Sequence, residues 1–422
     1  MKKTTKLAAS VLAALGLLAG FVPLLSASAD SLSTVSGSGE TVLVSGATPS
    51  SKNKTVPSGI AAPSEIDTSV SERDASGKYN AEEAVYLSAE DDLTITQAGV
   101  YVLTGNYTDK MIVVDAAKED KVQIVLENAV LSNKNGPAVY IRSADKVFLT
   151  AADGTENTIS DGSGYTLSDG ETTLDAAVFS KEDLTVNGSG KLIVTGNTKH
   201  AIVSKDDLVI TAKNLTVTAV NSCLYGKDSV KVSDAVVLAA AGTDGIHSDE
   251  FVVITGGTVS LKASEGIEAA YILITGGEIG IQASDDGINA ARKSATYTPT
   301  VEITGGTVTV TMGNGDTDGI DSNGNLIISG GTVYVNANSP FDYDGSASFT
   351  GGTVYVNGTQ VTSLPSQMMG GFGGRGSFRE GMGNQGGFGS SNGEQGSSEN
   401  QEGFGTFPGE QGGFRRGPGK HL

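Results

Sequence analysis

Acidic residues recur at a fixed place in a repeated phrase between residues 242 and 345. The phrase is an acidic residue followed by Gly, Ile and a polar residue, and a weaker copy follows the clear ones. From the Gly position of one copy to the next, the chain advances 21, 21, 32 and 21 residues. The copies are 244–247, 265–268, 286–289, 318–321 and 340–342. Self-similarity at such a period indicates a repeat architecture.

Stacking of these copies predicts two polar rows along one side of the protein. Equivalent residues in successive parallel strands lie roughly 4.8 Å apart. The first row contains Asp244, Glu265, Asp286 and Asp318. The second row, three residues further along each copy, contains His247, Glu268, Asn289, Asp321 and Asp342.

Rows of carboxylates at this spacing need a counter-charge. Two carboxylates about 5 Å apart repel by roughly 3 kcal/mol at an effective dielectric near 20. Ca²⁺ accepts the mixture of carboxylate, amide and backbone oxygens that the copies offer. The alternative is that these are solvated turn residues, because Asp-Gly is an ordinary turn dipeptide. The sequence therefore predicts calcium ligands, with Asp249 and Asp316 as auxiliary candidates. The predicted ligands are Asp244, Glu265, Glu268, Asp285, Asp286, Asn289, Asp316, Asp318, Asp321 and Asp342.

Short strand-like phrases separate the acidic copies and position them. Val252 and Ile254, then Val259 and Leu261, alternate with polar residues, and Gly-Gly turns join the phrases. A helix does not accommodate so many Gly and β-branched residues. We predict an all-β fold in which each repeat is one rung of a parallel β-helix. Earlier copies begin at 177, 201 and 223, and the polar stretch 153–175 reads as a long inserted loop.

Composition sets the boundaries and the expected partners. Residues 1–29 have a Lys-rich start, an apolar run and an Ala-Ser-Ala site, which predicts a secretory signal and an exported, extracellular or cell-wall protein. Residues 30–70 read as a linker, 71–362 as the β-helix, and 363–422 as a Gly- and Gln-rich disordered tail. The formal net charge of −20 argues against nucleic acid as a partner. No later stretch has the length of a membrane span, and a monomer is expected.

A second set of residues has side chains suited to sugar. Tyr334 and Tyr355 occupy the same place in adjacent copies and should form an outward pair, either as a sugar platform or as a cross-strand contact that stabilises the sheet. Lys205, Lys227 and Arg292 are candidates for charge-assisted hydrogen bonds to sugar carboxylates. The alternative for the lysines is a repeated, solvated turn position.

The chain resembles a family of secreted bacterial carbohydrate-binding proteins. The resemblance rests on stretches such as 122–126, 143–149, 175–184 and 204–208 and covers about 71–358. It implies a right-handed parallel β-helix, similar to family 9 polysaccharide lyases, that binds calcium, cellulose and acidic sugars such as polygalacturonate. Where that family tends to carry Asp-Gly in each of these rungs, this chain has 199–201 and 221–223 without an acidic residue, so the predicted calcium lies between 242 and 345.

These patterns favour a calcium-dependent carbohydrate-binding protein without catalysis. One alternative is a calcium-dependent pectate-type lyase, which needs a Lys or Arg base beside the metal. Lys262, Arg292 and Lys293 are the basic residues near the acidic copies, and none of them stands out as a base. Another alternative is a surface adhesin in which calcium is a structural staple.

Overall fold

The computed structural model describes residues 66–91, 93–165, 174–315 and 317–365. The predicted signal, most of the predicted linker, nearly all of the predicted tail and Asp316 lie outside these residues. Among the described residues, no helix is long and apolar enough to cross a membrane.

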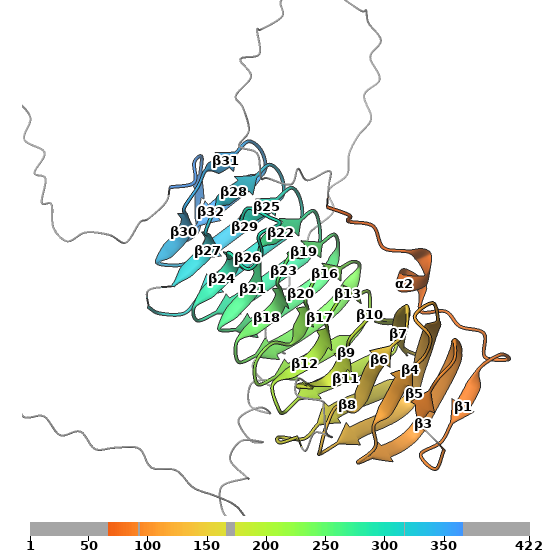
Figure 1. The fold of residues 1–422 in the computed structure, drawn as a ribbon. Coiled ribbons are helices and arrows are strands. Elements are labelled where there is room, and N and C mark those ends of the chain that lie inside the picture. Colours follow the sequence, from red (N-terminus) through yellow and green to blue (C-terminus); the bar gives the residue numbers. More distant parts are fainter. Residues whose placement is uncertain (1–65, 92, 166–173, 316, 366–422) are drawn as a thin grey trace, which may run out of the picture. The chain divides into compact units, whose positions relative to one another are not determined.

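Three ladders of parallel strands stack rung upon rung, as predicted (Figure 1). The first ladder contains β7 (Lys146–Ala151), β10 (Asp183–Gly188), β13 (Asp207–Ile210), β16 (Ser229–Val232), β19 (Phe251–Ile254), β22 (Tyr271–Ile274), β25 (Thr300–Ile303), β28 (Asn325–Ile328) and β31 (Ala347–Phe349). The second ladder contains β8 (Glu156–Asp161), β11 (Lys191–Gly196), β14 (Leu215–Ala219), β17 (Ala235–Ala241), β20 (Gly257–Ala263), β23 (Glu278–Ala283), β26 (Thr307–Met312), β29 (Thr332–Asn336) and β32 (Thr353–Val356). The third ladder contains β2 (Thr94–Ile95), β4 (Ile112–Asp115), β6 (Val139–Ser143), β9 (Ala176–Ser180), β12 (His200–Ser204), β15 (Leu224–Gly226), β18 (Asp244–Ser248), β21 (Glu265–Ala269), β24 (Asp286–Ala290), β27 (Asp318–Ser322) and β30 (Ser339–Tyr343).

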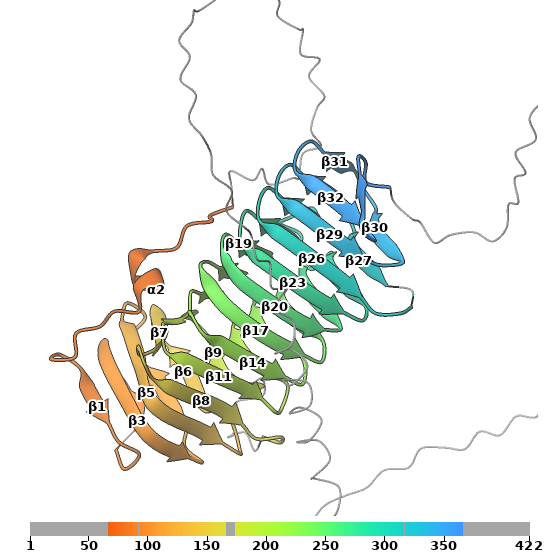
Figure 2. The same cartoon turned by 180° about the vertical axis from the view of Figure 1, so that it is seen from behind.

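From β6 onwards, each rung contributes one strand to every ladder, in the order third, first, second. Figure 2 shows the second ladder from the front, running from β8 to β32. Inward side chains of all three strands meet in one continuous apolar core, in which Ile246, Val252 and Leu261 are buried. Alternation along each strand leaves the other side chains facing outward. Outward residues of one ladder therefore form rows parallel to the stack.

The amino-terminal end of the stack is built from longer strands and a short helix. β1 (Val85–Leu87) pairs with β3 (Gly99–Thr108), which pairs with β5 (Lys121–Asn133). β5 is long enough to pair with both β7 and β8, so it joins the first two ladders. At the opposite end, β33 (Thr359–Val361) turns back antiparallel on β32.

Helix α2 (Glu72–Ser76) is attached to the first ladder through a buried carboxylate. Asp74 accepts hydrogen bonds from Ser71 Oγ at 2.6 Å and Thr185 Oγ1 at 2.5 Å. Its carboxylate also lies 2.8 Å from Lys146 Nζ. Burial opposes the charged form, but these partners outweigh it and lower the pKa of Asp74. Ser71, the predicted start of the domain, is the helix N-cap.

The folded part begins before the predicted boundary at residue 71. Ile66 is buried against Val253, Tyr271 and Leu273 on the outer side of the first ladder. Asp67 pairs with Lys231 at 2.9 Å. Residues 66–70, which the sequence assigned to the linker, therefore lie along the solenoid.

The predicted loop at 153–175 contains a strand, so that part of the prediction is wrong. β8 (Glu156–Asp161) pairs with β5 on one side and β11 on the other. Two of its inward positions are polar, which hides the strand pattern. Asn157 is fully buried, accepts a hydrogen bond from Ala129 N and donates to Lys191 O, so its amide is satisfied inside the stack.

Replacing the buried carboxylate beneath α2 should weaken the amino-terminal end. Asp74→Ala leaves Lys146 without its partner in a nearly dry position, and we expect a loss of about 3 kcal/mol of unfolding free energy in urea titrations. Glu72→Ala, on the same helix but exposed, is the matched control and should change stability by less than about 0.5 kcal/mol. Equal effects of the two substitutions would contradict this role for Asp74.

Candidate functional site

The strand register confirms that the acidic copies stack. Asp244 is paired with Glu265, and Asp286 with Asp318. The second row runs through successive pairings of His247, Glu268, Asn289, Asp321 and Asp342. These residues lie on the third ladder, and each acidic copy opens a strand there rather than forming a turn.

The glycine of each copy has a packing reason. A Cβ on Gly287 would lie 2.3 Å from Val310 Cγ1 and 2.4 Å from Gly319 O. Gly319 is confined in the same way, because its Cβ would lie 2.3 Å from Val335 Cγ1. In each of these Asp-Gly dipeptides, the Asp side chain faces outward, and the Gly that follows it faces inward, where there is no room for a side chain.

Protein cations neutralise the amino-terminal part of the rows. His247 Nδ1 lies 3.2 Å from Asp244 Oδ2 and 2.9 Å from Glu268 Oε2. Its Nε2 lies 3.4 Å from Asp249 Oδ1. Burial alone would lower the pKa of His247, but the three carboxylates outweigh it and hold that pKa well above its usual range. Lys293 Nζ lies 2.6 Å from Glu268 Oε1, so two cations serve this end.

By geometry, Asp244, His247 and Glu268 also form a group that can hold a metal ion, with one ligand atom from each within 4.8 Å of the others. We interpret the group as an ion-pair cluster. The pKa of Asp244 and of Glu268 is lowered despite burial because His247 lies beside both. Asp244 and Glu268 thus already contact protein cations, and their assignment as calcium ligands stays a prediction.

Further along the rows, Asp286 and Asp321 have no salt bridge to a basic residue among the described residues. Burial, followed by repulsion from Asp321, Asp285 and Asp318, raises the pKa of Asp286 to about 7. The pKa of Asp321 is raised to about 6 by burial and by Asp318 and Asp342.

Glu265 lies between the two parts. Burial, then the charges of Glu268 and Asp244, raise its pKa to about 7. Asn289 bridges it to the next rung: Asn289 Nδ2 donates to Glu265 Oε2 at 3.1 Å and to Asp286 Oδ2 at 3.2 Å. The neutral amide of Asn289 thus donates two long hydrogen bonds to these carboxylates but brings no positive charge, which a lysine at this position would supply.

Four buried side-chain oxygens of the described residues have no hydrogen-bond partner, and three of them lie in this region. These three are Asn289 Oδ1, Thr317 Oγ1 and Ser339 Oγ, and the last two residues are each 5% exposed. The fourth, Asp175 Oδ1, lies directly before β9. Ser339 is paired with Asp318 in the register, so it occupies the acidic position of the weaker copy. A buried polar atom left unpaired is costly. Neutral oxygens beside unneutralised carboxylates are the donor set that fits Ca²⁺.

The remaining predicted ligands have different positions. Asp318 and Asp342 take the places in the rows that the sequence assigned to them. Asp285 is exposed one residue before β24. Asp249, an auxiliary candidate, contacts His247 and also accepts from Tyr225 Oη at 3.3 Å. Sequence reasoning missed Thr317 and Ser339 because neither is acidic, although Ser339 stands at the repeat position that signalled the others.

The sugar-binding candidates lie on two different ladders. Tyr334 and Tyr355 stack on the second ladder, with ring centroids 4.9 Å apart and planes 9° from parallel. On the third ladder, Lys205 Nζ lies 4.9 Å from the Tyr225 ring centroid and 5.5 Å from that of Phe179. Burial lowers the pKa of this lysine.

The other two basic candidates point to nearby carboxylates. Lys227 pairs with the adjacent Asp228 at 3.1 Å and is exposed. Arg292 lies 4.0 Å from Asp344, with both side chains largely in solvent. Neither basic group therefore contacts the acidic rows, and their role in sugar binding stays a prediction.

The fold and these surfaces define a parallel β-solenoid whose outward polar side chains stand in long rows. Residues 89–362, more than half of the chain, match the family described as "Carbohydrate-binding domain-containing protein". The chain belongs to this family.

Two similar proteins extend this comparison. One is a carbohydrate-binding domain-containing protein of Acetivibrio thermocellus, 33% identical over 144 residues, which are 34% of this chain and 50% of that protein. The chain thus spans about half the length of this curated relative. The other is the structure of a polysaccharide lyase-like protein from C. thermocellum, a gadolinium derivative, with 24% identity, a TM-score of 0.35, and coverage of 65% of this chain and 96% of that one.

The ion pair at Glu268 should contribute measurably to stability. Lys293→Gln removes a charged partner from a carboxylate whose side chain is 9% exposed, and we expect a loss of about 2 kcal/mol in chelator-containing buffer at pH 7. Arg292→Gln, the adjacent and largely solvated basic residue, is the control and should change stability by less than about 0.5 kcal/mol. Equal unfolding midpoints for the parent and Lys293→Gln would show that Glu268 does not depend on this lysine.

Proposed function

We propose that this protein binds acidic polysaccharide through Ca²⁺ held on the third ladder between Glu265 and Asp342. The observation that carries the proposal is that three partnerless buried oxygens lie on the same rungs as, or on rungs next to, Asp286 and Asp321, whose carboxylates have no salt bridge to a basic residue of the described chain. Family membership supports carbohydrate as the ligand. The predicted signal at residues 1–29 is consistent with an exported protein that meets such polymers outside the cell.

The ion would be held by oxygens from adjacent rungs. Asp286, Asp318 and Asp321 supply charge, and Asn289, Thr317 and Ser339 supply neutral oxygens. Ca²⁺ takes six to eight oxygen ligands in flexible geometry, so a carboxylate of the polysaccharide can complete the set. Because the rows run along the stack, successive sugar carboxylates of an extended chain meet successive rungs.

We propose binding without cleavage. A pectate-type lyase needs a basic group that removes a proton beside the metal. Lys293, the lysine whose ammonium contacts the acidic rows, is held by Glu268, which raises its pKa although burial opposes this. A lysine stabilised as the ammonium ion is a poor proton acceptor.

The calcium proposal predicts a specific loss in a double variant. Asp286→Asn with Asp321→Asn keeps the shape of both side chains and removes their charge. In the parent, calcium at a hundred times its dissociation constant should add about 2.7 kcal/mol of stability. The double variant should lose this stabilisation, measured as the calcium-induced rise in melting temperature, and should also lose calcium-dependent retention on polygalacturonate.

A matched control separates this effect from general loss of charge. Glu82→Gln with Glu83→Gln removes two exposed charges outside the rows and should respond to calcium as the parent does. In chelator the Asp286 and Asp321 double variant should be at least as stable as the parent, since repulsion is relieved. An unchanged calcium response in that variant would refute the assignment, and ultraviolet absorbance from unsaturated sugar in the parent would refute binding without cleavage.

The raised pKa values predict how pH acts. Between pH of about 4 and 7, the folded protein keeps protons on Glu265 and Asp286 that the unfolded chain has lost. Without calcium, stability therefore falls as pH rises through this window. Calcium must displace these protons, so its stabilising effect should be larger at pH 8 than at pH 5. Thermal unfolding with and without calcium at both pH values measures this, and an equal calcium shift at both would contradict it.

A further inference from the structure

Asn-Gly pairs are positions at which a protein can alter its own side chains without an enzyme. The backbone nitrogen of the glycine attacks Cγ of the asparagine, ammonia leaves, and water opens the resulting succinimide ring to aspartate or isoaspartate. Glycine favours the attack because it has no Cβ to crowd the approach. The described residues contain five such pairs, which begin at Asn135, Asn187, Asn314, Asn323 and Asn357. Their order of reactivity depends on the folded structure around each pair.

Hydrogen bonds hold two of these asparagine side chains at both ends. Asn187 is fully buried; its Nδ2 donates to Asp74 O at 3.0 Å, and its Oδ1 accepts from Thr150 Oγ1 at 2.6 Å. Asn357 Nδ2 donates to Ala337 O at 3.0 Å, and its Oδ1 accepts from Ala337 N at 3.1 Å. Neither side chain can turn its Cγ towards the following nitrogen without breaking these bonds.

The glycines of two further pairs are packed inside the protein. Gly324 is buried, and a Cβ there would lie 2.1 Å from Pro299 O, so the backbone around it is confined. Gly136 is also buried, in a turn that Asn133 holds by accepting a hydrogen bond from Asn135 N at 3.0 Å. Ring closure requires the Asn-Gly peptide to rotate, so both pairs are protected.

Asn314 and Gly315 differ from the other pairs because both residues are exposed. Within the part of the chain that the structure describes, Asn314 makes no side-chain hydrogen bond. The φ of Gly315 is 144°, which glycine adopts readily. A Cβ on Gly315 would meet only Thr317 Cγ2, at 3.5 Å. No described neighbour therefore opposes the approach of Gly315 N to Asn314 Cγ.

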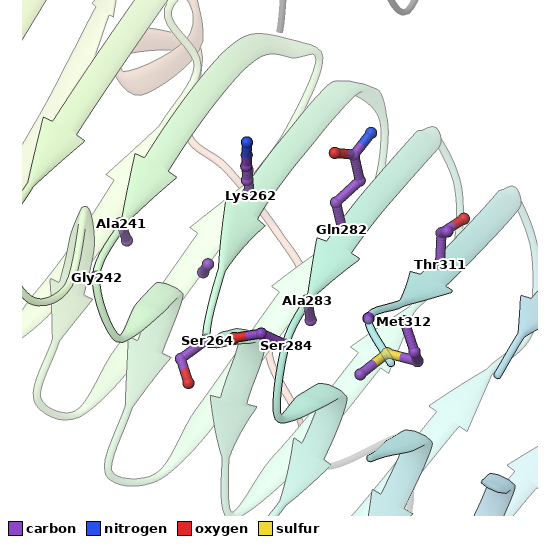
Figure 3. A pocket seen from close by; sticks show the side chains of 11 residues that line it. Ala241, Gly242, Lys262, Ser264, Gln282, Ala283, Ser284, Thr311 and Met312 are labelled. Atoms are coloured by element: carbon purple, nitrogen blue, oxygen red, sulfur yellow. The ribbon is translucent and has the colours of Figure 1, made fainter. Parts of the chain in front are cut away.

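Water also has access to this turn. Figure 3 shows Thr311 and Met312 at the end of β26, beside Ala283 and Ser284 of the previous rung. The turn leaves β26 through Gly313, which is exposed and lines an open groove of about 430 Å³. Water can therefore reach a succinimide in this turn and hydrolyse it.

The turn lies beside two oxygens of the proposed calcium site. Gly315 O accepts a hydrogen bond from Asn338 Nδ2 at 3.3 Å, and Asn338 directly precedes Ser339. Thr317 follows Gly315 by two residues. Ser339 Oγ and Thr317 Oγ1 are both buried oxygens without a partner. A carboxylate at position 314 would therefore add a negative charge at this edge of the acidic rows.

We propose that Asn314 is a site of spontaneous deamidation and that the carboxylate formed there strengthens calcium binding on the adjacent rungs. Attack of Gly315 N on Asn314 Cγ forms the ring and releases ammonia. One water molecule then opens the ring, so the net change replaces the amide nitrogen by an oxygen that carries the negative charge. The deamidation depends on the geometry of the turn alone, whereas its effect on calcium rests on the proposed function.

Mass spectrometry of the folded parent tests the modification. During incubation at pH 8 the peptide that contains Asn314 should gain one dalton, while peptides with the other four pairs stay unchanged. In urea all five pairs should react, since the protecting contacts are lost. Asn314→Gln should abolish the gain, and Asn323→Gln, the matched control, should leave it unchanged. No gain at position 314, or an equal gain at all five pairs in the folded protein, would overturn the site.

The effect on calcium is measured separately. Asn314→Asp carries the charge of the product and should show a larger calcium-induced rise in melting temperature than Asn314→Gln. Asn135→Asp adds the same charge in an exposed turn outside the rows and should respond as the parent does. Equal responses of Asn314→Asp and Asn314→Gln would refute the coupling. Absence of any calcium response in the parent would refute the proposed function and the coupling together, while the mass gain would still decide the deamidation.

Discussion

The strict register of parallel strand pairing is the constraint on which this structure depends. Each outward residue lies about 4.8 Å from its equivalents in the neighbouring rungs. Residues of one chemical type therefore become close neighbours along a row. Apolar and hydroxyl rows gain contacts from this, whereas a row of carboxylates accumulates repulsion. The second acidic row on the third ladder responds differently along its length. It begins with aromatic Tyr225, passes through His247 and Glu268, and reaches Asn289, Asp321 and Asp342.

Two kinds of counter-charge divide that row. At its amino-terminal end, His247 and Lys293 contact Glu268, and the pKa of this carboxyl group falls even though it is buried. From the next rung onwards, the protein supplies an amide and hydroxyls instead, and the pKa of Asp286 rises. The same repeat thus contains a half that protein cations neutralise and a half in which the proposed calcium ion would supply the counter-charge. If a Lys or His side chain contacted the carboxylates of every rung, no carboxylate of the row would be left to bind a ligand.

The sequence predicted the solenoid and the alignment of the acidic rows because both arise from the repeat itself. Regular spacing determines which residues stack, and alternation determines which of them face outward. Features outside the repeat were not predictable in this way. β8 was not predicted because a polar residue, Asn157, occupies one of its buried positions. The amide of Asn157 is hydrogen-bonded inside the core, so this position gives no apolar signal in the sequence. Lys293 lies in the stretch that lengthens one step of the repeat from 21 to 32 residues, so the repeat does not predict its contact with Glu268. Ile66 packs on β22, which is about 200 residues away in the sequence, and this contact is seen only in the folded structure.

A solenoid of this type can carry separate functions on separate ladders because its core and its surface use alternate residues. Val259 and Leu261 point into the core, and Ser260 between them faces outward, so an outward row can change without disturbing the apolar packing. The glycines show the distinction. A Cβ on Gly287 would clash with Val310 and Gly319, whereas a Cβ on Gly280 would meet no atom within 4 Å. An outward position such as Gly280 can therefore change without disturbing the packing that Gly287 maintains.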